Sequence, residues 1–235
     1  VPKVAQFYQI GRELAPNKLI VDNAGWGEFD RRCSDVFTQQ IAYYFPYKHH
    51  ADMFEEDFCW ELNGLASGDP ISTENHFPLG KVETRRRLNP IKPVIAHECA
   101  HYIDIPNYDD LNRRFDEFAK TVGDDYLKKE GIKKPRYLTE LPALIAAKKL
   151  EDKLPDYMQA SRTFKKLALK TYMERLRRSD RICGFEMLQL ADCLKYENHN
   201  GIIDVFDDDK YFDVEWTRRW NSDLVLLADF TNPRN

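Results

Sequence analysis

The chain has 235 residues, of which 43% are hydrophobic and 31% charged, a balance that is typical of a globular protein and excludes a disordered one. The formal net charge is −4, so the composition gives no reason to expect binding to nucleic acid or to an anionic membrane surface. No apolar run approaches the roughly 20 residues that a membrane-spanning helix needs. The five cysteines are odd in number and widely spaced, so we expect free thiols rather than a disulfide framework, and they leave the cellular compartment undecided.

In the first part of the chain, the spacing of apolar residues predicts one helix and two strands. An amphipathic helix is expected over residues 3–14, with Phe7 and Leu14 on its apolar side. Short apolar runs predict a buried strand over 18–21 and another over 36–44. Turn residues separate these elements, which is typical of alternating helices and strands.

The middle and the end of the chain continue this alternation after a long segment rich in Gly and Pro. That segment, roughly residues 59–90, is expected to be irregular. The elements expected after it are a strand at 93–98, helices at about 108–122, 138–150 and 156–179, a strand over 182–192 and a terminal strand at 224–228. Helices that alternate with buried strands predict an α/β fold with parallel strands.

The most conspicuous motif is His97-Glu98-Cys99-Ala100-His101, which matches H-E-x-x-H. On a helix, two histidines at i and i+4 share one face and can bind zinc, and the glutamate between them is the general base of a metallopeptidase. The surrounding sequence favours a strand instead, because prolines lie on both sides and the residues before His97 are apolar and β-branched. A zinc metallopeptidase that uses His97, Glu98 and His101 is therefore the alternative function.

If residues 93–98 form a strand, Glu98 lies at its C-terminal end, where β/α barrels carry their catalytic residues. The stretch Lys92-Pro93-Val94-Ile95-Ala96-His97-Glu98 resembles the nucleophile strand of family-two glycoside hydrolases, the relatives of β-galactosidases and β-glucuronidases. The block at 183–192, Cys-Gly-Phe-Glu-Met-Leu-Gln-Leu-Ala-Asp, resembles the eighth strand of the same barrel. The two blocks occur in the order that this family requires.

Two upstream passages extend the resemblance. Residues 13–21 resemble the approach to the fifth barrel strand, and residues 34–46 resemble the sixth. The resemblance implies a (β/α)8 TIM barrel, with residues 1–222 forming its C-terminal half, roughly strands five to eight. Residues 223–235 would then begin a following segment.

The resemblance also implies the chemistry: a retaining glycoside hydrolase that cleaves β-glycosidic bonds of a carbohydrate, with Glu98 as the nucleophile. Such an enzyme needs a second carboxyl group about 5–5.5 Å from the nucleophile, to act as acid and base. In the family this group belongs to an Asn-Glu pair at the end of the fourth strand, which we expect upstream of Val1, in the part of the barrel supplied by a longer parent chain. This chain alone is then expected to be catalytically incomplete, and neither a cofactor nor a metal is expected. A barrel that binds carbohydrate without cleaving it is the second alternative.

Six further residues are expected to contact the sugar: Asn23, Trp26, Tyr44, His97, Gln189 and Asp192. An amide such as that of Asn23 can hydrogen-bond sugar hydroxyls, and the indole of Trp26 can stack on a pyranose ring. Structural roles compete with these, since Trp26 can anchor a loop, Tyr44 can pack in the core, and His97 can be a buried structural histidine.

Overall fold

The computed structural model describes residues 2–21, 34–41, 59–62, 85–88, 92–180, 182–193 and 199–227 of the chain. The chain is divided into two compact units. The first unit comprises residues 1–100 and 171–187, and the second comprises residues 101–170 and 188–235. The long helix α6 (Leu154–Arg178) contributes to both units, because the division falls within it.

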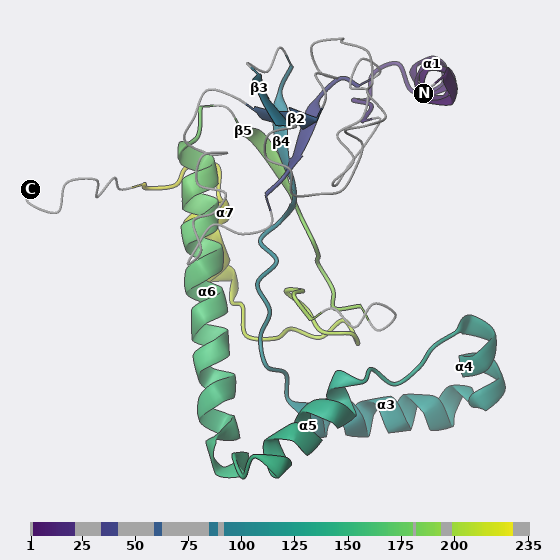
Figure 1. Cartoon of the computed structure of the whole chain (residues 1–235), viewed down its shortest axis with the longest axis vertical. Helices are drawn as coiled ribbons and strands as arrows, with labels where there is room; N and C mark the ends of the chain where they lie inside the picture. The colour runs from purple at the N-terminus through teal and green to yellow at the C-terminus, as the bar shows by residue number, and fades with distance from the viewer. Residues whose placement is uncertain are drawn as a thin grey trace, which may run out of the picture. The chain divides into compact units, whose positions relative to one another are not determined.

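A three-stranded parallel sheet is the main feature of the first unit (Figure 1). It contains β1 (Phe37–Gln40), β4 (Val94–Cys99) and β5 (Ile182–Met187), which pair in the order β1-β4-β5. The central strand β4 has four buried residues out of six, which explains why its sequence is so apolar. The strand predicted at 93–98 is therefore confirmed as β4, and it pairs in parallel with β1, which lies within the strand predicted at 36–44, and with β5.

A second, antiparallel pair of strands was not predicted. β2 (Cys59–Leu62) pairs with β3 (Arg85–Leu88), within the segment expected to be irregular. The expectation was wrong because most of the Gly and Pro residues that suggested an irregular segment lie between the two strands, and neither four-residue strand shows a clear alternation.

Helix α1 (Pro2–Leu14) confirms the helix predicted at the start of the chain, but the prediction of its packed side was wrong. Phe7 is 69% exposed and Leu14 is 81% exposed. Polar contacts orient the helix instead, since the Tyr8 hydroxyl donates a hydrogen bond to Asp35 Oδ1 at 2.9 Å.

The same carboxylate explains why residues 18–21 do not form the expected strand. Asp35 Oδ2 pairs with Arg12 and accepts the Ile20 N–H at 2.7 Å, and the Asp35 N–H donates to the Ile20 carbonyl at 2.8 Å. Ile20 thus satisfies its backbone groups through one loop residue, and no strand ladder is needed.

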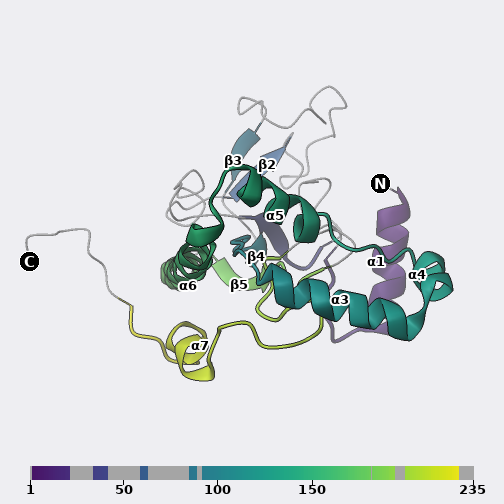
Figure 2. The same ribbon diagram turned by 90° about the horizontal axis from the view of Figure 1, so that it is seen from below.

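Helices dominate the second unit (Figure 2). They are α3 (Tyr108–Val122), α4 (Asp124–Glu130), α5 (Tyr137–Ala147), the short 3₁₀ helix η5 (Glu151–Lys153), the first part of α6, and α7 (Val214–Asn221). Tyr108 and Leu111 of α3 pack against Tyr137 and Leu138 of α5 in a buried cluster. The helices predicted at 108–122, 138–150 and 156–179 are confirmed as α3, α5 and α6, whereas α4 and α7 were missed because each is only about two turns long.

The prediction for α6 placed Phe164, Leu167, Ala168, Tyr172 and Leu176 on its buried face, and the last three are indeed buried. The buried positions of the helix are Lys165, Ala168, Leu169, Tyr172, Met173 and Leu176. Phe164 and Leu167, which were expected to face inward, are 39% and 53% exposed. Spacing alone favoured these two apolar residues, whereas the buried stripe includes Lys165.

The chain after β5 is mostly irregular. The strand expected over residues 182–192 ends at Met187, because residues 190–192 bond instead to the segment at 202–203. The terminal strand expected at 224–228 is not formed over its described residues, and Leu224 and Leu226 are exposed.

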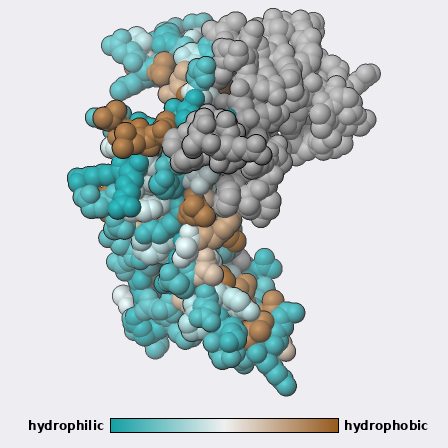
Figure 3. All heavy atoms as spheres, turned by 90° about the vertical axis from the view of Figure 1, so that its left-hand side faces the viewer, coloured by the Kyte–Doolittle hydropathy of each residue, from teal (hydrophilic) through white to brown (hydrophobic). Residues whose placement is uncertain are grey.

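The described surface in Figure 3 is largely hydrophilic and is interrupted by separate apolar patches. This pattern agrees with the high content of charged residues. Among the described helices, none combines the length and the apolar character needed to cross a membrane.

Candidate active site

Glu98 lies at the C-terminal end of β4, where a bulge interrupts the pairing with β5. Ala96 aligns with Phe185 and Cys99 aligns with Met187, so three steps along β4 match two steps along β5. Glu98 itself has a φ angle of +47°, in the left-handed region that residues other than glycine rarely adopt. An extra residue of this kind re-aims the side chains around it, and such bulges are frequent beside active sites.

The bulge allows the side chains of His97 and Glu98 to approach each other, although consecutive residues of a regular strand point to opposite faces. His97 Nε2 lies 3.6 Å from Glu98 Oε1, which is within ion-pair range but too long for a hydrogen bond. The other ring nitrogen, Nδ1, contacts Glu186 Oε2 on β5. The side chain of His97 is 8% exposed, that of Glu98 31% and that of Glu186 65%. A buried imidazole therefore lies between two carboxylates that solvent can reach.

Cys99 follows Glu98 and is fully buried. Burial raises the pKa of its thiol to about 12, so the thiol is protonated at neutral pH and is a poor nucleophile. Among residues 97–99, Glu98 is thus the partly exposed anionic group that could attack an electrophilic carbon.

The strand geometry also separates the parts of the H-E-x-x-H motif. His97 and Glu98 belong to β4, whereas His101 follows the strand, in residues without helical structure, and belongs to the second unit. The helix that would place both histidines on one face is not formed. In the part of the chain that the structure describes, no group of three or more His, Cys, Asp or Glu side chains is arranged to hold a metal ion.

Asp192, which was expected to contact the sugar, takes part in a buried ionic cluster in the second unit. We use this name for Asp104, Lys165, Asp192 and Lys210, whose side chains are only 1–7% exposed. Lys210 Nζ lies 2.9 Å from both Asp192 Oδ2 and Asp104 Oδ1, and Lys165 Nζ lies 2.9 Å from Asp104 Oδ1. The two positive and two negative charges balance inside the unit.

Burial and mutual attraction act in opposite directions on these groups. Burial lowers the pKa of Lys165 to about 8 and raises the pKa of Asp192. Burial also acts to raise the pKa of Asp104, but the ammonium groups of Lys165 and Lys210 outweigh it and hold that pKa below its usual value. The cluster is therefore a network of mutually dependent charges.

Gly201 completes this cluster through its backbone. Its N–H donates to Asp192 Oδ1 at 2.7 Å, and its carbonyl accepts from Lys165 Nζ at 2.9 Å. A Cβ atom at this position would lie 2.5 Å from the backbone nitrogen of Asp192, so the close approach requires glycine. In this arrangement the Asp192 carboxylate joins Gly201 and Lys210 and so has a structural role. Its contact with a sugar stays a prediction.

The other predicted sugar-binding residues differ in how far the structure describes them. Asn23, Trp26 and Tyr44 lie outside the described residues. Gln189 is half-buried in the second unit, and its Nε2 atom has no hydrogen-bond partner among the described residues. Among the predicted sugar-binding residues that the structure describes, His97 is thus the one that lies next to Glu98.

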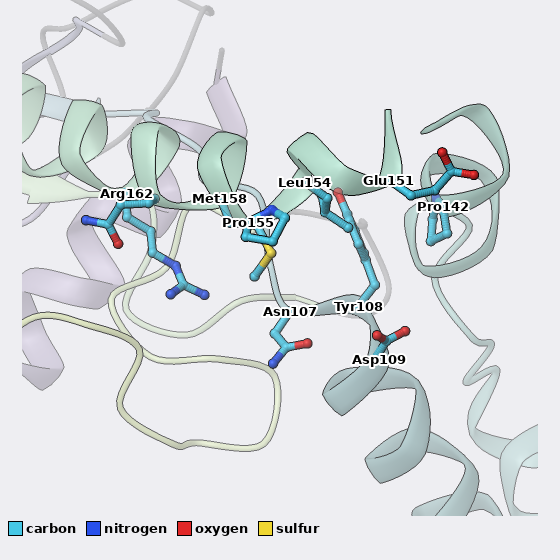
Figure 4. A pocket seen from close by; sticks show the side chains of 10 residues that line it. Asn107, Tyr108, Asp109, Pro142, Glu151, Leu154, Pro155, Met158 and Arg162 are labelled. Atoms are coloured by element: carbon cyan, nitrogen blue, oxygen red, sulfur yellow. The ribbon is translucent and has the colours of Figure 1, made fainter. Parts of the chain in front are cut away.

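A cavity of about 500 Å³ lies within the second unit, between the beginnings of α3 and α6 (Figure 4). Arg162 and Met158 extend from α6 toward Asn107, which caps α3. The remaining lining residues are Tyr108, Asp109, Pro142, Glu151, Leu154, Pro155 and Gln159. Its volume and its mixture of charged, amide and apolar side chains are suited to a small polar ligand.

Two features of these sites could not be recognised from the sequence. The contact between His97 and Glu186 joins residues 89 positions apart, and the pairing of Asp104 with Lys165 joins residues 61 positions apart. The one available signal was the charged residue at position 165 within an apolar helix face, next to Ala168 and Leu169. A lysine in such a stripe indicates a buried partner but does not identify it.

A scan against protein-family models finds no match, and a search of curated proteins finds no relative.

Proposed function

We propose that the protein is a retaining glycoside hydrolase, similar to the family-two enzymes, that cleaves β-glycosidic bonds with Glu98 as its nucleophile. The observation that carries the proposal is the position of Glu98 at the C-terminal end of a parallel strand, on a bulge, with 31% of its side chain exposed. Catalytic carboxylates of β/α barrels occupy that position.

The order of the strands supports the proposal. β1, β4 and β5 pair as neighbours in the order in which they occur along the chain, all parallel, and helices α3 to α6 connect β4 to β5. Neighbouring parallel strands joined through helices are the repeating unit of a β/α barrel. These three strands match in order the sixth, seventh and eighth strands that the sequence resemblance implies.

The reaction has two steps. A Glu98 carboxylate oxygen attacks the anomeric carbon, the bond from that carbon to the leaving oxygen breaks, and a second carboxyl group gives its proton to the leaving oxygen. Water then attacks the same carbon, its proton passes to the second carboxylate, and the ester to Glu98 breaks. Two inversions give net retention. The second carboxyl group belongs, on this proposal, to the Asn-Glu pair of the family's fourth strand.

The first test replaces Glu98 by glutamine in the full-length product of the reading frame that encodes this chain. An amide is nearly isosteric with a carboxylate but is a poor nucleophile, so kcat for 4-nitrophenyl β-D-galactoside or β-D-glucuronide should fall by on the order of 10³-fold or more. The thermal midpoint should stay unchanged. Glu13→Gln is a matched control, because Glu13 is an exposed glutamate of α1, in the same unit.

Azide provides a second measurement for the same residue. In Glu98→Ala the vacated space admits an anion on the face that the carboxylate used, so azide should restore part of the turnover and give a glycosyl azide of inverted configuration. Near wild-type turnover by Glu98→Gln would show that Glu98 is not the nucleophile.

The cavity of about 500 Å³ in the second unit favours a second candidate function, a barrel that binds carbohydrate without cleaving it. Its volume falls within the usual range of ligand sites. The same assays separate the two candidates, because a binding protein would bind the aryl glycosides without releasing 4-nitrophenol.

A further inference from the structure

We propose that His97 and Glu186 are positioning residues that hold the Glu98 carboxylate in its reactive orientation. This inference rests on the proposed function and adds two residues to it. Neither residue needs to touch the sugar in order to act in this way.

The first step of the argument is the backbone. A bulge re-aims the side chains around it, so the direction of the Glu98 carboxylate depends on the local backbone of β4. The Glu98 side chain is 31% exposed, so the contact with His97 Nε2 lies at the edge of the buried region. A nucleophile displaced by about 1 Å can lose on the order of 10²-fold in rate, so a partner that fixes the carboxylate affects catalysis directly.

His97 is suited to this role because its own position is fixed. Its ring is 8% exposed, and it is part of the central strand of the sheet. Its Nε2 atom faces Glu98 Oε1 at 3.6 Å. The ring thus presents one nitrogen to the proposed nucleophile from a rigid, buried site.

Glu186 determines which way the ring faces. It contacts Nδ1 from the adjacent strand β5, on the opposite side of the ring from Glu98. An ionised carboxylate can only accept hydrogen bonds, so Nδ1 carries the proton in this contact. The contact at Nδ1 fixes the plane of the ring, so that Nε2 stays directed at Glu98 Oε1.

The exposure of Glu186 makes the inference testable. Its side chain is 65% exposed, and an ion pair at such a site contributes little to the stability of the fold. Loss of this carboxylate should therefore change catalysis without unfolding the protein. Loss of a residue with a purely structural role would instead lower the stability of the fold and leave kcat of the folded protein unchanged.

The experiment measures kcat, KM and thermal midpoint for Glu186→Gln, Glu186→Asp and His97→Gln in the full-length protein, with 4-nitrophenyl β-D-galactoside and β-D-glucuronide as probes. For Glu186→Gln, kcat should fall by about tenfold, with KM within about twofold of the wild-type value. Glu186→Asp keeps the carboxylate and should retain more of kcat. His97→Gln should lose more than Glu186→Gln, and Glu13→Gln should lose nothing.

Covalent labelling of Glu98 gives a readout that a structural role would not change. A 2-deoxy-2-fluoro aryl β-glycoside of the accepted sugar should form its ester with Glu98 more slowly in Glu186→Gln, by the same factor as kcat, as followed by intact mass. The inference is overturned if Glu186→Gln keeps both wild-type kcat and wild-type labelling while Glu98→Gln is inactive. If Glu98→Gln keeps its activity, the proposed function itself fails, so the two failures are distinguishable.

Discussion

Four charged side chains in the interior of the second unit depend on one another for their stability. Asp104 is the centre of this buried ionic cluster, because a single oxygen, Oδ1, lies 2.9 Å from both Lys165 Nζ and Lys210 Nζ. A buried ion pair adds little net stability compared with apolar residues, but removal of one partner leaves an uncompensated charge. Asp104 is therefore the residue whose loss the second unit should tolerate least.

Asp104→Asn should lower the free energy of unfolding by about 3–5 kcal/mol at pH 7, because two ammonium groups would then share Asp192 alone. Denaturant unfolding measures the difference. Asp116→Asn is the control, since Asp116 pairs with Lys134 at 2.8 Å but is 58% exposed, and its loss should cost less than about 1 kcal/mol. Equal losses in the two variants would contradict this account of the cluster.

The difference in the free energy of unfolding between wild type and Asp104→Asn should depend on pH in a defined direction. Lys165 and Lys210 hold the pKa of Asp104 below the usual value of 3.8, against the effect of burial. A carboxyl whose pKa is lower in the folded state stabilises the fold above its unfolded pKa, and this stability is lost as the pH falls through the folded value. The difference in the free energy of unfolding between wild type and Asp104→Asn should therefore be full between about pH 5 and about pH 8, the pKa of Lys165, and should narrow below pH 3.8.

At the scale of single elements, α1 is held by one carboxylate more than by its apolar side. Asp35 accepts hydrogen bonds from the Tyr8 hydroxyl and the Ile20 N–H and pairs with Arg12, whereas Phe7 and Leu14 are exposed. The Ile20 N–H is the largest influence that lowers the pKa of Asp35. The helix should thus be anchored locally, and its stability should depend on Asp35.

Asp35→Asn should increase amide exchange across residues 5–14 by about tenfold, because the amide would weaken contacts with three groups that each contribute about 1 kcal/mol. The global midpoint of unfolding should change little. Hydrogen-exchange mass spectrometry of that peptide tests this, with Asp180→Asn as the control, since Asp180 is an exposed aspartate of the same unit. Unchanged exchange in Asp35→Asn would mean that another contact anchors α1.

The elements predicted correctly are those with a strong local signal. Helix α3 begins after Asn107, whose side chain caps it, and ends at Gly123, which has a φ angle of +79°. Strand β4 follows a proline and is apolar throughout its first half. The prediction for α6 was right for Ala168, Tyr172 and Leu176 but missed Lys165, which is buried with Asp104, a partner far away along the chain. The bulge at Glu98 was missed for the same reason, since it exists only in the pairing of β4 with β5.

At the scale of the whole molecule, the choice between a glycosidase and a zinc peptidase depends on whether one element carries the whole H-E-x-x-H motif. The structure divides it, with His97 and Glu98 in β4 of the first unit and His101 in the second unit. In the β/α barrel that we propose, the catalytic residues come from the C-terminal ends of the strands. His101, which follows β4, therefore needs no catalytic role in that enzyme.

This difference leads to a prediction for the purified full-length protein. Elemental analysis should find no stoichiometric zinc, and a chelator should leave aryl β-glycoside turnover unchanged. The zinc site of an H-E-x-x-H motif needs both imidazoles on one helix face, but His97 belongs to β4 and His101 follows that strand in residues without helical structure. A strand also cannot present side chains at i and i+4 side by side as a helix does. The control is His101→Ala, which should keep the turnover of the wild type. One zinc per chain that is lost in His101→Ala, together with chelator-sensitive peptidase activity, would favour the peptidase and exclude Glu98 as a glycosidase nucleophile.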